Sequence, residues 1–394
     1  MSGRTFGDEL TLGSTQEALH DHGTAIEVPP GGRRDRQWRI VIGDNLIERF
    51  GLVAAWVVMA VVFSITVPSF RQSGTFDIIF GSQATQLVVT FAVVIVLAAG
   101  EFDLSVANVL GVSAVSLVYL NTQYHWPFLL ALVVVLIGSI VFGSINALIT
   151  VGLGVPSIVV TLGTGTLISG VADGWAGESP IGGASVSFVN AVSHKFLGLP
   201  VGFWIAFVIG VVLYFILEHT PLGRHLLFVG RSQDVARLAG VRVNRIRAGS
   251  LIACSLLSAI AGILLVGLTG SADPNVAASY LLPAFAGAFL GSTTIKPGQF
   301  NIVGSFIAVY FLVTGVTALQ ILGYTGWVQD VFYGGSLVAA VVITQLLSRQ
   351  RARALRSVGS GGRSNNAGPH GGTDPSSQNG SVAPRPEDIG ASTN

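Results

Sequence analysis

Long apolar runs separated by short polar segments dominate the pattern of this 394-residue chain. A helix needs about 20 mainly apolar residues to cross the hydrocarbon core of a membrane. We predict ten such spans, of which the second, third and eighth are short or interrupted: residues 50–68, 85–100, 104–121, 127–150, 156–172, 201–218, 249–269, 280–292, 301–319 and 328–347. The pattern predicts an all-α, polytopic membrane protein with about ten transmembrane helices.

The composition supports a membrane protein and excludes a soluble one. Charged residues make up only 10% of the chain, against roughly 25% in soluble domains. Hydrophobic residues make up 51%, and the mean hydropathy is +0.68. The single cysteine, Cys254, excludes a disulfide framework and a cysteine-rich metal site.

Both ends of the chain differ in composition from the apolar middle. Residues 1–49 are polar, and residues 349–394 are rich in Ser, Gly, Asn and Pro, so we expect mostly disordered tails. We expect the membrane domain at 50–348. No apolar run precedes residue 50, so we expect no cleavable signal peptide.

The placement of arginine predicts the orientation. Arginine collects in three places: before the first span, after the last, and in residues 224–247, which hold six arginines. Such clusters mark cytoplasmic loops. Six predicted spans precede residues 224–247 and four follow, so an even number separates each pair of clusters. This count favours ten spans with both termini cytoplasmic.

Two predicted helices are interrupted by polar residues. Residues 98–111 place Glu101 and Asp103 between two short apolar segments, and Asp103 or Ser105 is suited to cap the helix that follows. A discontinuous helix in the membrane and a plain cytoplasmic hairpin with a capping aspartate explain this equally well. Residues 285–309 have a similar form, and paired interrupted segments indicate a transport site.

The span beginning at Pro156 has an unusually small and hydroxylated surface, which includes Thr161 and Thr164. Small residues allow close helix packing, and this is the favoured interpretation. The alternative is a polar wall for a hydroxyl-bearing solute.

No catalytic set is recognisable. Residues 291–298 contain a lysine but lack the spacing of a phosphate-binding P-loop. His125, His194 and His219 are isolated near the ends of spans. We therefore expect no enzyme activity and no cofactor.

Four ordered motifs between about residues 50 and 348 resemble the permeases of bacterial ABC importers for ribose, xylose, arabinose and similar small solutes. They are carried by Gly100, Asp103, Leu104, Ser105 and Val106; by Asn146, Leu148, Pro156, Ile158, Thr161, Leu162, Gly163 and Thr164; by Thr220, Gly223 and Arg224; and by Gly230, Val235, Ala236, Arg237, Leu238, Gly240, Val241 and Val243. The chain departs from the usual pattern at Glu101, where many relatives have glycine, and at 281–283, where two acids are replaced. These departures leave the solute open.

The resemblance implies a permease subunit of the bacterial plasma membrane that imports a monosaccharide or polyol. The implied partners are cytoplasmic ATPase subunits, an extracytoplasmic solute-binding protein and a second permease chain, either a copy or a related chain. It implies a solute path beside Asp103, Ser105, Asn108, Asn146, Thr161 and Thr164. It also implies a helix near residues 231–240 that couples the permease to the ATPase, with coupling residues Gly230, Ser232, Asp234, Val235, Ala236, Arg237, Leu238, Ala239 and Gly240.

Local chemistry agrees with a short helix at the coupling position. Ser232 is suited to cap it, Asp234 suits its first turn, and Gly240 suits a left-handed end. Val235 and Leu238 lie on one apolar face. Two turns are too short to be stable without a partner. Docking on an ATPase is favoured, and a helix held by arginines against lipid headgroups is the alternative.

A secondary transporter is the alternative function. It requires ionisable groups within the membrane, for which the sequence offers Glu101, Asp103 and Asp330.

Overall fold

A computed structural model describes residues 34–177 and 179–361. The helices are α1 Arg34–Thr66, η1 Pro68–Arg71, α2 Ser73–Phe76, η2 Asp77–Gly81, α3 Ala84–Ala98, α4 Val106–Thr122, α5 Phe128–Ala147, η3 Leu148–Gly152, α6 Ser157–Ala176, α7 Val186–Ser193, α8 Val201–His219, α9 Pro221–Arg231, α10 Gln233–Leu238, α11 Val243–Thr269, η4 Pro274–Val276, α12 Ala277–Gly291, α13 Ile302–Ile321 and α14 Trp327–Gly361. Four two-residue strands form two antiparallel pairs, β1 Ile181–Gly182 with β4 Ser271–Ala272 and β2 Lys195–Phe196 with β3 Leu199–Pro200. The predicted all-α membrane fold is confirmed.

Every predicted span contains a helix, but not all are long enough to cross a membrane alone. Eight helical segments of the described residues are sufficiently long and apolar. The other two predicted spans correspond to α4, with 17 residues, and α12, with 15. Both adjoin a polar break, which explains why their apolar runs are short.

Several predicted boundaries were wrong. The second span is not short, because α2 and η2 extend it to Ser73–Ala98, a run of 26 residues. α11 begins at Val243 rather than 249 and therefore includes two arginines predicted to lie in a loop. The predicted arginine loop is itself largely helical, since α9 and α10 occupy it.

Helix extends into both of the predicted tails. α1 already begins at Arg34, and α14 continues to Gly361, where Arg, Ala, Leu and Gln favour helix. The rest of both predicted tails, residues 1–33 and 362–394, lies outside the described residues. The predicted cytoplasmic position of both termini stays a prediction.

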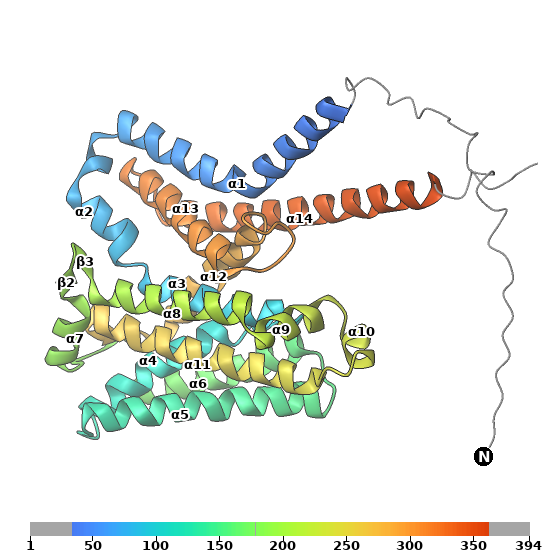
Figure 1. The fold of residues 1–394 in the computed structure, drawn as a ribbon. Helices are drawn as coiled ribbons and strands as arrows, with labels where there is room; N and C mark the ends of the chain where they lie inside the picture. Colours follow the sequence, from blue (N-terminus) through green and yellow to red (C-terminus); the bar gives the residue numbers. More distant parts are fainter. Residues whose placement is uncertain (1–33, 178, 362–394) are drawn as a thin grey trace, which may run out of the picture.

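The helices lie side by side along one direction in layers, with α1, α13 and α14 in one part and α5, α8 and α11 in the other (Figure 1). α11 packs against α3, α4 and α5. Glycines allow the closest approaches: a β-carbon at Gly262 would overlap the backbone of Leu110 on α4, and one at Gly143 would lie 2.9 Å from Ile252 Cα on α11. α3 is buried along its whole length.

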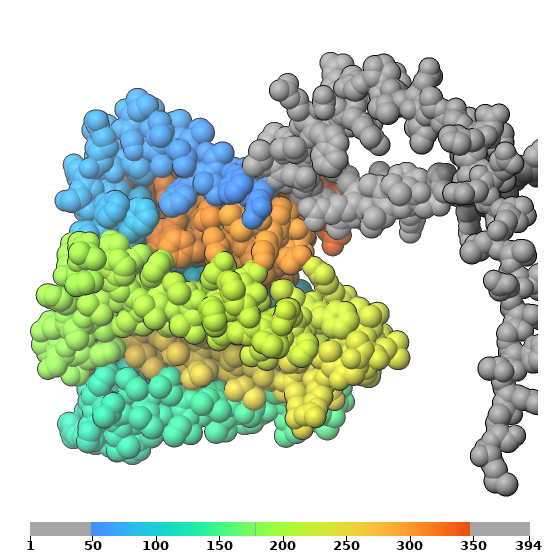
Figure 2. All heavy atoms as spheres, viewed as in Figure 1, coloured from blue at the N-terminus to red at the C-terminus, as the bar shows by residue number. Residues whose placement is uncertain are grey.

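The two ends of the bundle carry different elements. α7 and the pair β2–β3 lie at one end, and α9 and α10 lie at the other (Figure 1). The arginine-rich α9–α10 region projects from its end of the molecule (Figure 2). We call these the outer end and the coupling end, after the predicted orientation.

Candidate path and coupling sites

The break between α3 and α4 exposes backbone donors that helix bonding does not satisfy. Gly100 adopts a left-handed φ of 80°, which ends α3. The amide of Phe102 then donates to Ser157 Oγ at 3.1 Å, and the amide of Leu104 donates to Thr161 Oγ1 at 2.9 Å. Two α6 hydroxyls thus replace the missing helical partners, as burial in a membrane protein demands.

Asp103 holds the start of α4. Its Oδ1 accepts from the Ser105 amide at 2.9 Å and from Ser105 Oγ at 2.5 Å. The predicted side-chain cap of α4 was wrong: Ser105 occupies the N-cap position without a side-chain bond to the helix amides, and Asp103 instead forms a turn with Ser105 just before α4.

The predicted path residues lie together. Asn146 Nδ2 donates to Ser105 Oγ at 3.2 Å, and Thr164 Oγ1 donates to Asn146 Oδ1 at 2.7 Å. We call Asp103, Ser105, Asn146, Thr161 and Thr164 the polar network. The first four have relative exposures of 0%, and Thr164 is half-buried. Asn108 lies beside it, since a β-carbon at Gly165 would approach Asn108 Nδ2 at 2.7 Å.

Burial changes how these residues are to be understood. In this conformation the polar groups of the network, apart from Asp103 Oδ2, bond to one another and to backbone, and four of the five side chains are closed to a solute. The prediction that they form the path therefore stays a prediction. What the geometry displays directly is a buried junction of α4, α5 and α6 around the break.

Glu101 pairs with Arg247 on α11. The glutamate side chain is 4% exposed and the arginine side chain 17%. A buried carboxylate is costly unless paired, so this contact fixes the break to the first turns of α11. The sequence singled out Glu101 but gave no sign of its partner, 146 residues away.

The same break touches the coupling end directly. A β-carbon at Gly230 would overlap the carbonyl oxygen of Ala98, and one at Gly100 would lie 3.1 Å from Gly230 Cα. The backbones of α9 and the break are therefore in contact. Gly230 is the point where residues 230–240, which we call the coupling segment, meet the transmembrane core.

The predicted helix of the coupling segment is confirmed. α10 is capped by Ser232 Oγ, which accepts from the Val235 amide at 3.4 Å, and Gly240 has φ of 79°. Ala236 is buried against Val229 and Val243. The predicted apolar face is exposed: Val235 by 52% and Leu238 by 89%.

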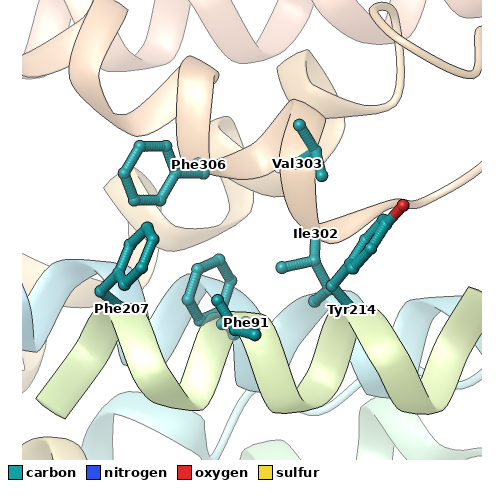
Figure 3. A pocket seen from close by; sticks show the side chains of 8 residues that line it. Phe91, Phe207, Tyr214, Ile302, Val303 and Phe306 are labelled. Carbon is teal, nitrogen blue, oxygen red and sulfur yellow. The ribbon is translucent and has the colours of Figure 1, made fainter. Parts of the chain in front are cut away.

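One cavity of about 190 Å³ lies between α3, α8 and α13. The rings of Phe91, Phe207 and Phe306 face it together with Ile302, and the hydroxyl of Tyr214 lies at its edge (Figure 3). With no polar group directed into it, this space suits an acyl chain or an apolar side chain and offers nothing to a hydroxyl-bearing solute.

Comparison with known proteins decides the family. The family model described as "Branched-chain amino acid transport system / permease component" matches residues 75–341. The chain belongs to this family. This permease is therefore a non-catalytic, multi-pass membrane subunit of a bacterial ATP-binding-cassette import system, whose complex includes an ATPase and a binding protein.

Several relatives are similar along most of their length. The permease is 28% identical over 317 residues to the ribose import permease protein RbsC of Haemophilus influenzae, covering 79% of this chain and 97% of the relative. It is 32% identical over 263 residues to the autoinducer 2 import system permease protein LsrD of Salmonella paratyphi B, covering 65% and 78%. No solved structure matches.

The second predicted break lies between α12 and α13. Asn301 caps α13 by accepting from the Gly304 amide at 2.6 Å, and its Nδ2 donates to the carbonyls of Gly291, Thr294 and Gln299 at 3.1–3.2 Å. The sequence pattern identified this break but not Asn301, although an asparagine before an apolar run is a recognisable cap signal.

Proposed function

We propose that this permease imports a small uncharged polyhydroxy solute and that α10 docks it on the ATPase. The observation that carries the docking is the combination of a capped two-turn helix with an exposed apolar face, projecting from one end of the bundle (Figure 2). A helix of six residues is not stable alone, and an 89% exposed leucine at its end calls for a partner surface.

The solute class is supported by one relative's name and by the scarcity of charge in the spans. RbsC is named for ribose, a monosaccharide. Between Asp103 and Asp173 no Asp, Glu, Lys or Arg interrupts the sequence. A passage lined by hydroxyls and amides offers balanced donors and acceptors to neutral hydroxyl groups without binding them too tightly to release.

The polar network has a role consistent with its burial. We propose that the six residues predicted for the path form its movable border, held closed in this conformation by the hydrogen bonds of the polar network. Motion of the coupling segment would reach this border through the Gly100–Gly230 contact and the Glu101–Arg247 pair. A second permease chain, a copy or a relative, completes the path, and the binding protein delivers the solute at the outer end.

The docking is tested by Leu238→Arg. The change places a charge on the apolar face of α10, outside the folded core, so the permease should insert normally. Recovery of the ATPase in a pull-down with the full-length permease should fall by about tenfold, the effect of losing about 1.4 kcal/mol of binding.

The matched control is Leu153→Arg. Leu153 is 74% exposed and lies between η3 and α6, near Ser157, which bonds to the break at the coupling end. This variant should retain the ATPase. If α10 instead rests on lipid headgroups, an added arginine would strengthen that contact and leave ATPase recovery unchanged, and this result would reject the docking.

A further inference from the structure

A second and more polar cavity lies between α3, α12, α13 and α14, and we call it the outer cavity. It has a volume of about 320 Å³, within the range of about 300–1,000 Å³ that is usual for small-molecule sites. Its lining consists of Ile78, Gln83, Gln86, Val276, Ser279, Tyr280, Pro283, Val313, Val316, Thr317, Gln320, Gln329 and Tyr333. Eight of these thirteen side chains carry an amide or a hydroxyl, and none is ionisable at neutral pH.

The outer cavity lies at the end of the bundle opposite the coupling segment. Ser279 and Gln329 lie in the first turns of α12 and α14, and Gln320 lies in the last turn of α13. Gln86 lies in the first turn of α3, whose other end contacts Gly230. Twelve residues of helix, about 18 Å, separate Gln86 from Ala98.

The lining groups have free hydrogen-bonding capacity. Within the described part of the chain, the side-chain amides of Gln320 and Gln329 make no hydrogen bond, and buried Gln86 makes one long bond, 3.3 Å from Nε2 to Thr90 Oγ1. Each amide both donates and accepts. Gln86 is buried and Gln329 half-buried, so hydration that their amides lose is recovered only when a ligand or water bonds to them, whereas the exposed amide of Gln320 stays open to either.

A break in helix bonding adds a backbone acceptor. Pro283 lies inside α12 and has no amide hydrogen, so the Ser279 carbonyl lacks the partner that an ordinary residue at 283 would supply. Ser279 and Pro283 both line the outer cavity. The rings of Tyr280 and Tyr333 supply apolar surface with a polar tip, which suits the C–H faces and hydroxyl rim of a sugar ring.

From this chemistry we infer that the outer cavity is a binding site for a neutral polyhydroxy molecule, occupied on the way from the outer end to the break. The inference rests on the proposed direction and class of transport. It adds the residues that recognise the solute: three glutamines from three helices, Gln86, Gln320 and Gln329, with Ser279, Tyr280 and Tyr333. A charged solute is disfavoured because the site offers no counter-charge for a desolvated ion.

The test measures protection of a cysteine at the rim of the cavity. Ser279 is exposed, and Cys254 is buried and is replaced by serine. In sealed cells that make the full chain, an impermeant thiol reagent applied outside should label Ser279→Cys. At least one of ribose, xylose, arabinose, glycerol and inositol should slow the labelling, while gluconate and glucosamine should not.

A lining variant and a matched control complete the test. Gln320→Leu should raise the sugar concentration that gives half-protection by about tenfold, the effect of one lost hydrogen bond. Gln123→Leu changes an exposed glutamine at the end of α4 that does not line the cavity, and it should change nothing.

Three results would overturn the inference: no labelling from outside, protection by none of the neutral compounds or equally by the charged ones, or unchanged protection in Gln320→Leu. The measurement needs no ATPase. Failure here is therefore distinct from failure of the α10 docking, which the pull-down reports by itself.

Discussion

The two helix breaks of this permease are built alike but are attached to different things. In each, an apolar helix ends, a polar side chain bonds to the backbone at or just before the start of the next helix, and a glycine allows close backbone contact. Asp103 serves the first break and Asn301 the second. Gly230 lies against the first, and Gly304 closes the second against the carbonyl of Gly291.

The attachments differ in burial and charge. The first break carries the buried Glu101–Arg247 pair and meets the coupling segment. The second is tied to the middle of α1, because the Arg49 carbonyl accepts from the Ile295 amide at 2.9 Å and from Thr294 Oγ1 at 2.7 Å. Its ion pair, Lys296–Glu218, has a 44% exposed lysine side chain. In the proposed mechanism, a similar local structure serves motion at the first break and anchoring at the second.

The largest effect is expected from adding a β-carbon at the glycine contacts. Gly230→Ala and Gly304→Ala each force neighbouring backbone segments apart. Each should lower the free energy of unfolding by about 3 kcal/mol or more, measured as a lower unfolding temperature in detergent. Protein of the first variant that does fold should hydrolyse ATP without uptake, whereas the second should remain coupled. Gly249→Ala, with open space around its β-carbon, is the control and should be neutral. If ATP hydrolysis drives uptake equally well in Gly230→Ala and Gly304→Ala, the proposed difference between the two breaks is wrong.

The second-largest difference between the two breaks is expected in the stability lost when one partner of each ion pair is removed. Arg247→Met leaves a buried carboxylate without its partner and should cost about 3 kcal/mol, with much of the loss restored in Glu101→Leu/Arg247→Met. Lys296→Met should cost less than about 1 kcal/mol because its pair is partly exposed. A double-mutant cycle on unfolding temperatures measures the coupling. A coupling free energy near zero between Glu101 and Arg247 would mean that the pair does not fix the break.

Removal of the polar side chains at the two breaks should rank below removal of the ion pair. Asn301→Ala deletes one accepted hydrogen bond and the two amide hydrogens that Nδ2 shares among three carbonyls, and it should cost about 2 kcal/mol. Asp103→Ala deletes two accepted bonds, both with Ser105, and should lower the yield of folded protein in the membrane by a smaller cost, about 1 kcal/mol or more. The measurement is the yield of folded protein after mild detergent extraction. A larger loss of yield for Asp103→Ala than for Asn301→Ala would contradict the assignment of the second break as the anchor.

The smallest stability effect is expected at the edge of the polar network. Thr164→Val keeps the side-chain shape but removes the 2.7 Å bond to Asn146, at a cost of about 1 kcal/mol. Expression should be unchanged and the rate or selectivity of uptake altered. Thr166→Val is the control, since this exposed threonine of the same helix bonds only to the Leu162 carbonyl. Identical uptake by Thr164→Val and Thr166→Val would mean that the small and hydroxylated surface of α6 serves only helix packing.

Local signals in the sequence predicted local structures well. Ser232 and Gly240 bound α10 as their residue types indicate, and the polar interruptions at 100–105 and 292–301 are real breaks. The hydroxyls of α6 were noticed, but their bonds to Phe102 and Leu104 were not, because a hydroxyl pattern does not identify its partner. The α9 helix was missed, since arginines at 224 and 231 and a histidine made a short amphipathic helix look like a loop.

The Glu101–Arg247 pair and the outer cavity left no signal of their partners in the sequence. Arg247 was counted only as a cytoplasmic charge, and Gln86, Gln320 and Gln329 passed unnoticed inside predicted spans or at their ends. Each is unremarkable by itself, because a single amide near the end of a membrane helix is well tolerated. Only the packing of α3 against α12, and of α12 against α13 and α14, brings them to one cavity.

The outer cavity also has a consequence for how the protein is made. Ribosomes deliver the helices to the membrane in chain order, and the wall of this cavity is drawn from α3 near the beginning and from α14 at the end. Gln329 and Tyr333 arrive last. A nascent chain arrested before α14 therefore lacks one wall of the outer cavity, and the cavity is complete only after the last helix has been inserted.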